Sequence, residues 1–160
     1  MSRRDRLRGR GRPTARYPLP VDDVAAATRA LRLAERAWQL AHLRTDEGGP
    51  AAVAAAREAL DQAQQALQEC YETIELTALA PEDYEQLVAQ HPPREGSDDE
   101  EWDTEQFPVA CFLACAPGDM GDQEWAEFLR RNVSWLERQE LLQLAVAVNV
   151  RAVDPAVPKG

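Results

Sequence analysis

The first half of the chain repeats small and apolar residues at intervals of three and four. This spacing runs through residues 22–43 and again through 51–74. Such alternation places the apolar residues on one face of a helix, and the glycines and proline of residues 44–50 separate the two helices. An antiparallel helical hairpin is therefore predicted. Its stripes are Val24, Ala27, Leu31, Ala34, Trp38 and Ala41 on the first helix, then Val53, Ala56, Leu60, Ala63, Leu67, Cys70 and Ile74 on the second.

The hydrophobic period then changes from helical to alternating over residues 73–79. Ile74, Leu76 and Ala78 fall on one side and polar residues fall between them. Strict alternation predicts a short strand. No second strand is evident nearby, so we expect an edge strand, with continuation of the preceding helix as the alternative.

The second half of the chain predicts four short helices. Pro81 suits the first turn of the first helix, and His91 stands before two prolines that end it. Thr104 is placed to cap the second helix, which is the most apolar in the chain. Ser134 and Glu137 form a capping box at the start of the last. The expected ranges are 81–90, 105–115, 122–131 and 134–149.

These elements predict a mainly α fold in which a helical hairpin precedes a small helical domain, with one short edge strand at 73–79. We expect four segments. They are a disordered arginine-rich tail at 1–20, an alanine-rich hairpin at 21–75, a helical domain at 76–150 with an acidic loop at 94–104, and a disordered tail at 151–160.

Charge is distributed unevenly along the chain, whose formal net charge is −10. Residues 1–16 hold seven arginines and one acid, so the rest of the chain is near −16. An acidic body repels phosphates. Nucleic acid binding is therefore expected only through the tail, if that tail is more than a solvated extension. The candidate residues for such binding are Arg3, Arg4, Arg6, Arg8, Arg10 and Arg12.

The acidic loop carries seven Asp or Glu residues among the eleven of 95–105. Its order of acids lacks the fixed alternation around a glycine that calcium loops use. We therefore interpret it as a solvated, mobile loop. Trp102 is the exception, because an apolar ring in such a loop is expected to anchor it to the body.

Residues suited to catalysis are sparse. There are two histidines, three serines and three cysteines without a CxxC spacing, so we expect no catalytic residue, metal site or cofactor. Cys70, Cys111 and Cys115 are interpreted as small buried residues. No apolar leader follows the arginines and no run is long enough to span a membrane, so we expect a soluble intracellular protein.

Four successive stretches within residues 84–149 resemble a known family. They read YEQLVAQHPP, WDTEQFPVACFLAC, DMGDQEW and LQLAVAVN. In this order and spacing they are similar to the tail assembly chaperones of long-tailed, siphovirus-type phages or prophages of actinobacteria. The hairpin, the arginine tail and the stretch RRNVSW lie outside the match. The matching positions are Tyr84, Leu87, His91, Pro92, Pro93, Trp102, Phe107, Pro108, Leu113, Ala114, Met120, Trp125, Leu144, Ala145, Ala147 and Asn149.

The resemblance implies a binding protein without a catalytic residue. Members of the family coat the tape measure protein before tail tube subunits polymerise around it, and a longer frameshifted product is often made. It implies action in the host cytoplasm and absence from the mature virion. Partners would be the tape measure protein, the tail tube protein and other copies of the chain. The expected partner-binding residues are Tyr84, Leu87, Trp102, Phe107, Phe112, Leu113, Trp125 and Leu144.

The residues themselves are compatible with such holding. Apolar helices at 105–115 and 134–149 flank a strongly acidic loop, which would keep a coated apolar client soluble. Three alternatives stay open: a nucleic-acid-associated protein acting through the arginine tail, a structural tail-completion or connector subunit that remains in the virion, and a bacterial acidic adaptor.

Overall fold

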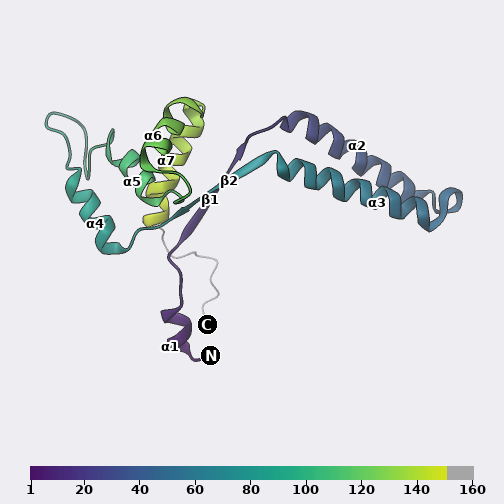
Figure 1. Cartoon of the computed structure of the whole chain (residues 1–160), viewed down its shortest axis with the longest axis horizontal. Coiled ribbons are helices and arrows are strands. Elements are labelled where there is room, and N and C mark those ends of the chain that lie inside the picture. Colours follow the sequence, from purple (N-terminus) through teal and green to yellow (C-terminus); the bar gives the residue numbers. More distant parts are fainter. Residues whose placement is uncertain (151–160) are drawn as a thin grey trace. The chain divides into compact units, whose positions relative to one another are not determined.

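The chain is mainly helical, with one two-stranded sheet. The computed structural model describes residues 1–150, except for the side chains of residues 45–47. Figure 1 shows the order of its elements. They are α1 (Arg3–Arg8), β1 (Thr14–Pro20), α2 (Val24–Leu43), α3 (Thr45–Glu69), β2 (Tyr71–Thr77), α4 (Pro81–Gln90), α5 (Phe107–Cys115), α6 (Asp122–Arg131) and α7 (Trp135–Asn149).

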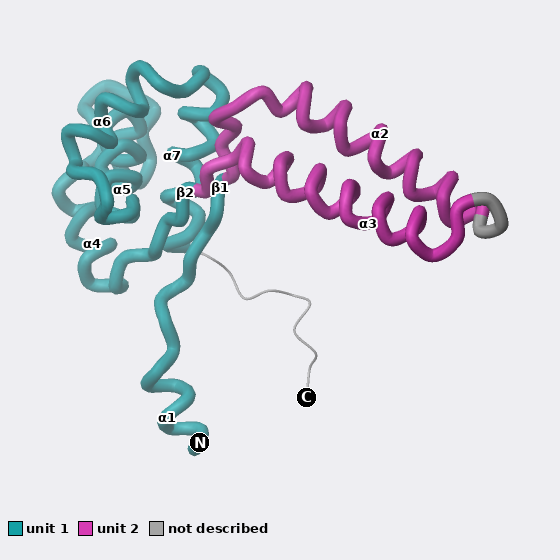
Figure 2. The backbone as a smooth tube through the Cα atoms, turned by 45° about the vertical axis from the view of Figure 1, so that its right-hand side comes forward, with its two compact units in different colours: residues 1–17, 74–160 teal, residues 18–73 magenta. Residues whose placement is uncertain are grey.

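The chain divides into two compact units, coloured separately in Figure 2. Unit 1 comprises residues 1–17 and 74–160, and unit 2 comprises residues 18–73. The expected disordered segment at 151–160 lies outside the described residues. Within 1–150, no helix combines the length and the apolar character needed to cross a membrane.

Unit 2 consists mainly of α2 and α3, which pack against one another and are called the hairpin below. Every residue of the first stripe is partly shielded from solvent, and Leu60 on the second is 5% exposed. Asp23 caps α2 by accepting a hydrogen bond from the Ala26 N–H at 2.9 Å. Gly49 interrupts α3 with φ 62° and ψ −167°, a region open essentially to glycine alone. The turn between α2 and α3 is narrower than residues 44–50.

The second helix ends earlier than its stripe predicted. α3 stops at Glu69, and Ile74 belongs to β2. Ile74 lies four residues after Cys70, which fits one face of a helix, and two residues before Leu76, which fits one side of a strand. Ile74 satisfies both patterns.

The prediction of disorder over 1–20 was wrong for residues 14–20, and the edge strand expected at 73–79 is present as β2. Residues 14–20 form β1, which pairs with β2. Hydrogen bonds from Val21 N–H to the Cys70 carbonyl and from Ala78 N–H to the Pro13 carbonyl, both 2.8 Å, flank the antiparallel ladder. Ala15, Tyr17 and Leu19 alternate as its less exposed positions. Its prolines are tolerated because a two-stranded sheet has only edge strands.

An ion pair to β2 and a tyrosine hydroxyl that hydrogen-bonds to α7 hold β1 in unit 1. Arg16 Nε lies 2.8 Å from Glu75 Oε2 on the neighbouring strand. The Tyr17 hydroxyl donates a hydrogen bond to Glu140 on α7. This bond raises the pKa of Tyr17 to about 12. An arginine-rich beginning therefore does not prevent the chain from ordering once its alternate residues meet a partner.

The core of unit 1 lies between α5 and α7. Phe107, Cys111 and Phe112 on α5 and Leu141 and Ala145 on α7 are completely buried. Trp125 from α6 packs edge-on against Phe112, with ring centroids 5.7 Å apart. The predicted helices at 81–90 and 122–131 are confirmed in their bounds, and the capping box of Ser134 and Glu137 is present.

Candidate functional site

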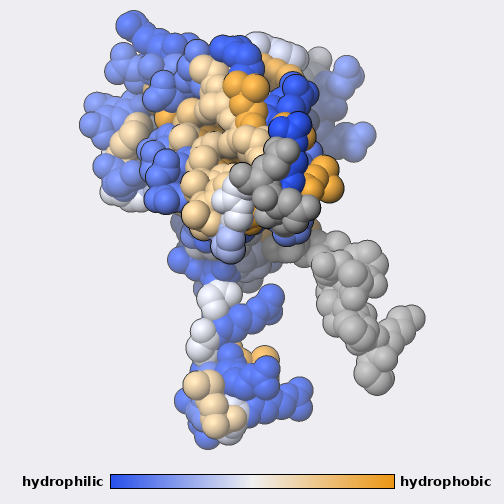
Figure 3. Space-filling model, turned by 90° about the vertical axis from the view of Figure 1, so that its right-hand side faces the viewer, coloured by the Kyte–Doolittle hydropathy of each residue, from blue (hydrophilic) through white to orange (hydrophobic). Residues whose placement is uncertain are grey.

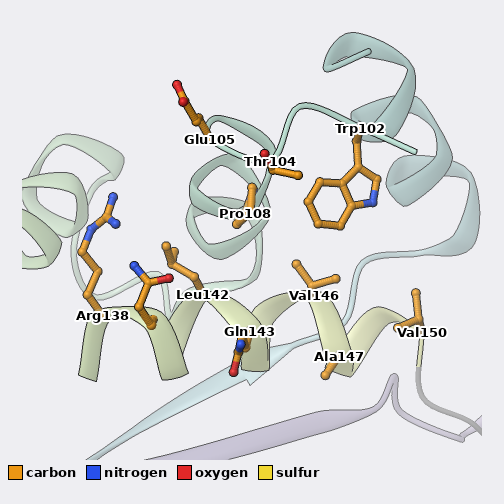
Figure 4. A pocket seen from close by; sticks show the side chains of 11 residues that line it. Trp102, Thr104, Glu105, Pro108, Arg138, Leu142, Gln143, Val146, Ala147 and Val150 are labelled. Carbon is orange, nitrogen blue, oxygen red and sulfur yellow. The ribbon is translucent and has the colours of Figure 1, made fainter. Parts of the chain in front are cut away.

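An open groove runs along one side of α7 in unit 1, with a volume of about 650 Å³. Leu142, Val146 and Val150 line it from α7 and the residue after, at intervals of four that keep them on one helix face. Trp102 and Pro108 line the opposite wall (Figure 4). The remaining lining residues are Thr104, Glu105, Arg138, Gln139, Gln143 and Ala147.

The groove lies beside the core, because α7 is apolar on adjoining faces and Leu142, which lines the groove, is itself only 6% exposed. Leu141, Ala145 and Val148 face inward and are at most 4% exposed. Val146 lies on another side and is only partly covered. A helix that is apolar on one face only would bury it against α5 and leave no apolar surface for a ligand. The second face of α7 therefore supplies a binding surface without opening the core.

Trp135 extends this face beyond the groove. It precedes Leu142 by seven residues, which places it on the same side of α7. Its side chain is 75% exposed, an unusual position for an indole. A large exposed aromatic residue in line with an apolar groove is typical of an interaction surface.

The aromatic wall of the groove is fixed by ring contacts. Trp102 lies against Phe107, with ring centroids 4.6 Å apart. Phe107 in turn meets Tyr84 and His91 edge-on, at 5.9 Å and 6.2 Å. The expectation that Trp102 anchors its loop is therefore confirmed. Because Phe107 is completely buried, Trp102 is held against the core of the unit.

The acidic loop is organised around Arg94, contrary to the prediction of a mobile segment. Its guanidinium binds both carboxylate oxygens of Asp99, at 2.9 Å and 3.2 Å, and also pairs with Glu105. The side chain of Asp99 is only 3% exposed. Hydrogen bonds from Arg94, and then from Thr104, hold the pKa of Asp99 well below its usual range. One arginine thus compensates several acids, which the count of charges did not indicate.

Asp103, rather than the expected Thr104, caps the turn that precedes α5, and α5 itself has no side-chain cap. Its Oδ1 accepts hydrogen bonds from the N–H groups of Glu105 and Gln106, at 2.8 Å and 3.0 Å. Its own N–H donates to the His91 carbonyl at 3.0 Å. Thr104 instead donates its hydroxyl to Asp99 at 2.7 Å. α5 begins at Phe107 rather than at 105, and the hydrogen bond from Asp103 to His91 ties the loop end to the end of α4.

The eight expected partner-binding residues separate into three groups. Phe107, Phe112 and Trp125 are at most 5% exposed, so they form the core and are not available to a partner. Trp102 lines the groove, and Tyr84 lines an adjoining hollow of about 470 Å³ that also includes Trp102 and Val150. The remaining three are partly exposed but do not line the groove: Leu87, Leu113 and Leu144.

Negative charge concentrates beside the groove. Residues 81–105 contain ten acids and one arginine. Glu85 and Glu101 share the adjoining hollow with Trp102 and Tyr84. Arg138, on the opposite side, is the one basic residue that lines the groove. The site therefore combines an apolar groove with mainly acidic residues beside it.

The two cysteines of α5, Cys111 and Cys115, are buried and share a hydrogen-bond donor, Asn149. Asn149 Nδ2 donates to Cys111 Sγ at 3.4 Å and to Cys115 Sγ at 3.3 Å, while its Oδ1 accepts from Leu79 N–H at 2.7 Å. The hydrogen bond to Cys115, together with burial, raises the pKa of Cys111. As predicted, all three cysteines are buried. In the described part of the chain, no three His, Cys, Asp or Glu side chains gather as metal ligands would.

The candidate nucleic-acid residues lie on α1 and the segment after it. These six, Arg3 to Arg12, are exposed. Among the side chains that the structure describes, no ion pair involves any of them. Asp5 is engaged by Ser2, in a capping box that starts α1. The positive charge of this segment is therefore available to a partner.

Comparisons with known proteins give no match to a protein family, a curated protein or a solved structure.

Proposed function

We propose that this protein is a phage tail assembly chaperone, which binds the tape measure protein, keeps it soluble and assists assembly of the tail tube. The supporting observation is the groove along α7, which is apolar, open and bordered by acids. A tape measure protein is a long helical chain with exposed apolar stripes. An amphipathic helix in an apolar groove is a recurrent mode of recognition.

The residues that line the groove are suited to holding a client protein rather than to catalysing a reaction. Val146, Val150 and Trp102 offer apolar contact area, while polar lining residues such as Gln139 and Gln143 offer adaptable hydrogen bonds. The neighbouring acids repel other coated complexes and so limit aggregation. We propose that no bond is made or broken, and that the client leaves when tail tube subunits displace the chaperone.

Co-expression with the tape measure protein tests the proposal. The wild-type chain should keep that protein in the soluble fraction. Val146→Glu places a charge in the groove and should shift the client into the pellet, because a carboxylate facing an apolar helix is costly. Leu136→Glu is the matched control. It makes a similar change on α7, at a residue that is 59% exposed and does not line the groove.

Both variants must first show the helix content and melting temperature of the wild type. Equal client solubility with Val146→Glu and wild type would exclude the groove as the binding site. Mass spectrometry of finished virions provides a second criterion. We expect the chain to be absent from them, and a stoichiometric presence would favour a structural tail subunit instead.

The unpaired arginines favour a second candidate function, binding of nucleic acid through residues 3–12. Such binding is electrostatic, so it should weaken steeply as salt concentration rises. Deletion of residues 1–12 should abolish it and leave client solubility unchanged. Retention of nucleic acid binding after the deletion would contradict this assignment.

A further inference from the structure

The hairpin of unit 2 has a second apolar stripe on α2 that its own partner helix does not cover. The stripe repeats at intervals of four and three, and all its side chains are exposed. Leu33 is 67% exposed and Leu40 is 46% exposed. Soluble proteins rarely leave heptad-spaced leucines in water without a partner. The stripe consists of Ala26, Ala30, Leu33, Ala37 and Leu40.

Helix α3 carries a matching stripe of exposed small residues, Ala52, Ala55, Ala59 and Ala66. At 100° per residue, each exposed stripe is rotated in the same sense from the buried stripe of its helix. Two antiparallel helices are related by a two-fold axis perpendicular to the plane of the hairpin. Stripes that are rotated in the same sense about their own helices therefore point to the same broad face of the hairpin. We name these nine residues the apolar face. The opposite broad face is polar and includes Thr28, Glu35, Gln64 and Gln68.

Figure 3 faces the tip of the hairpin and shows apolar surface gathered over it between hydrophilic patches. All nine residues of the apolar face are exposed, so this face lies on the outside of the unit.

Charges of opposite sign occupy the two outer edges of the hairpin. Arg29 and Arg36 project from the edge of α2 that lies away from α3, and Glu58 and Glu69 project from the far edge of α3. Within the described side chains of residues 18–73, the one ion pair joins Arg57 to Asp61, both on α3. No ion pair therefore crosses between the two helices in this range, and the edge charges stay available.

We propose that the apolar face binds the apolar face of a second copy of this chain, forming a four-helix bundle in which each α2 lies over the α3 of the other copy. A two-fold axis parallel to the helices generates this arrangement. It places Arg29 and Arg36 of each copy beside Glu58 and Glu69 of the other.

Two observations select this arrangement over the alternative, in which α2 lies over α2. The alternative brings the arginine edges of both copies together and the glutamate edges together, which is repulsive. It also packs leucine on leucine and alanine on alanine, so the helices could not keep even spacing. Leucines of α2 facing alanines of α3 combine large with small side chains, as well-packed cores do. This inference is independent of client binding.

Charge exchange tests the proposal on the full-length chain. One variant carries Arg29→Glu and Arg36→Glu, and a second carries Glu58→Arg and Glu69→Arg. Sedimentation velocity at low salt should show wild-type dimers, while each variant alone dimerises about tenfold more weakly or worse. An equimolar mixture should restore the dimer, because both interfaces then pair opposite charges. Gln64→Glu with Gln68→Glu, on the polar face, should leave the wild-type dimer intact.

Three results would overturn the proposal. They are a monomeric wild type at about 100 μM, where even weak specific dimers assemble, variants that dimerise as tightly as wild type, and a mixture that fails to associate. If the wild type is monomeric and Leu33→Asp with Leu40→Asp releases the client, then the apolar face serves the client and not a second copy.

Discussion

The two units bury their apolar residues to different depths. In unit 1, Phe107, Phe112 and Leu141 are completely inaccessible to solvent. In the hairpin, most of the stripe is only partly covered, and Leu60 and Cys70 are its buried members. Alanine lets helices approach closely but removes little area from water. Unit 1 therefore closes its core and keeps a separate groove, whereas the hairpin has a shallow core and an exposed face beside it.

The largest expected effect comes from removing a ring from the closed core. Phe112→Ala should lower the free energy of unfolding by about 3–5 kcal/mol, through lost burial and the cavity left behind. The counterpart on the hairpin stripe, Ala34→Gly, should cost only about 1 kcal/mol, mainly through helix propensity. Urea unfolding followed by circular dichroism measures both. Equal losses would mean that the two units are packed alike.

A smaller effect is expected at the hairpin turn. Gly49→Ala should destabilise the protein by about 1–3 kcal/mol, because φ 62° with ψ −167° is strained for any residue with a Cβ. Gly118→Ala is the control. A Cβ there meets no atom within 4 Å and its φ is not positive. A Gly49→Ala variant as stable as this control would mean that the turn does not constrain the hairpin.

Loss of the Arg94–Asp99 pair in the acidic loop should give the smallest change in stability at neutral pH. Its effect on stability should also depend on pH. The pKa of Asp99 is lowered in the folded state, so the unfolded chain takes up this proton first as pH falls. The stabilisation is complete above about pH 4 and is lost below it. Asp99→Asn should lower the melting temperature at pH 7, and the difference from wild type should shrink towards pH 3.

Asp98→Asn is the comparison for this experiment, because Asp98 is exposed and takes part in no ion pair of the described residues. It should keep the wild-type pH dependence. If Asp99→Asn keeps that dependence too, Arg94 does not organise the loop as the structure indicates.

Periodicity identified those elements whose residues contact one another along a single helix face. The hairpin stripe from Val24 to Ala41 is an example, and the capping box of Ser134 is another. β1 was missed although Tyr17 and Leu19 alternate, because arginines and prolines suggested disorder. The partner strand lies over fifty residues away, and no local signal reports such pairing.

The site was predictable only in part, for a related reason. The sequence indicates that Trp102 anchors its loop. It does not show whether a given aromatic ring faces the core or the groove. Phe107 and Phe112 were expected at the surface and are buried. The groove depends on which face of α7 remains after Leu141 and Ala145 have packed on α5, and only the three-dimensional arrangement decides that. Val146 and Trp135 were spaced suitably in sequence but not selected.

Site-specific photo-crosslinking tests most directly whether the groove holds the client. A photoreactive residue is introduced at position 146 in one protein and at position 136 in another, and each is irradiated in the presence of the tape measure protein. We expect a strong crosslink from position 146 and little from position 136. Equal crosslinking from the two positions, or binding of the client without any crosslink from position 146, would contradict it.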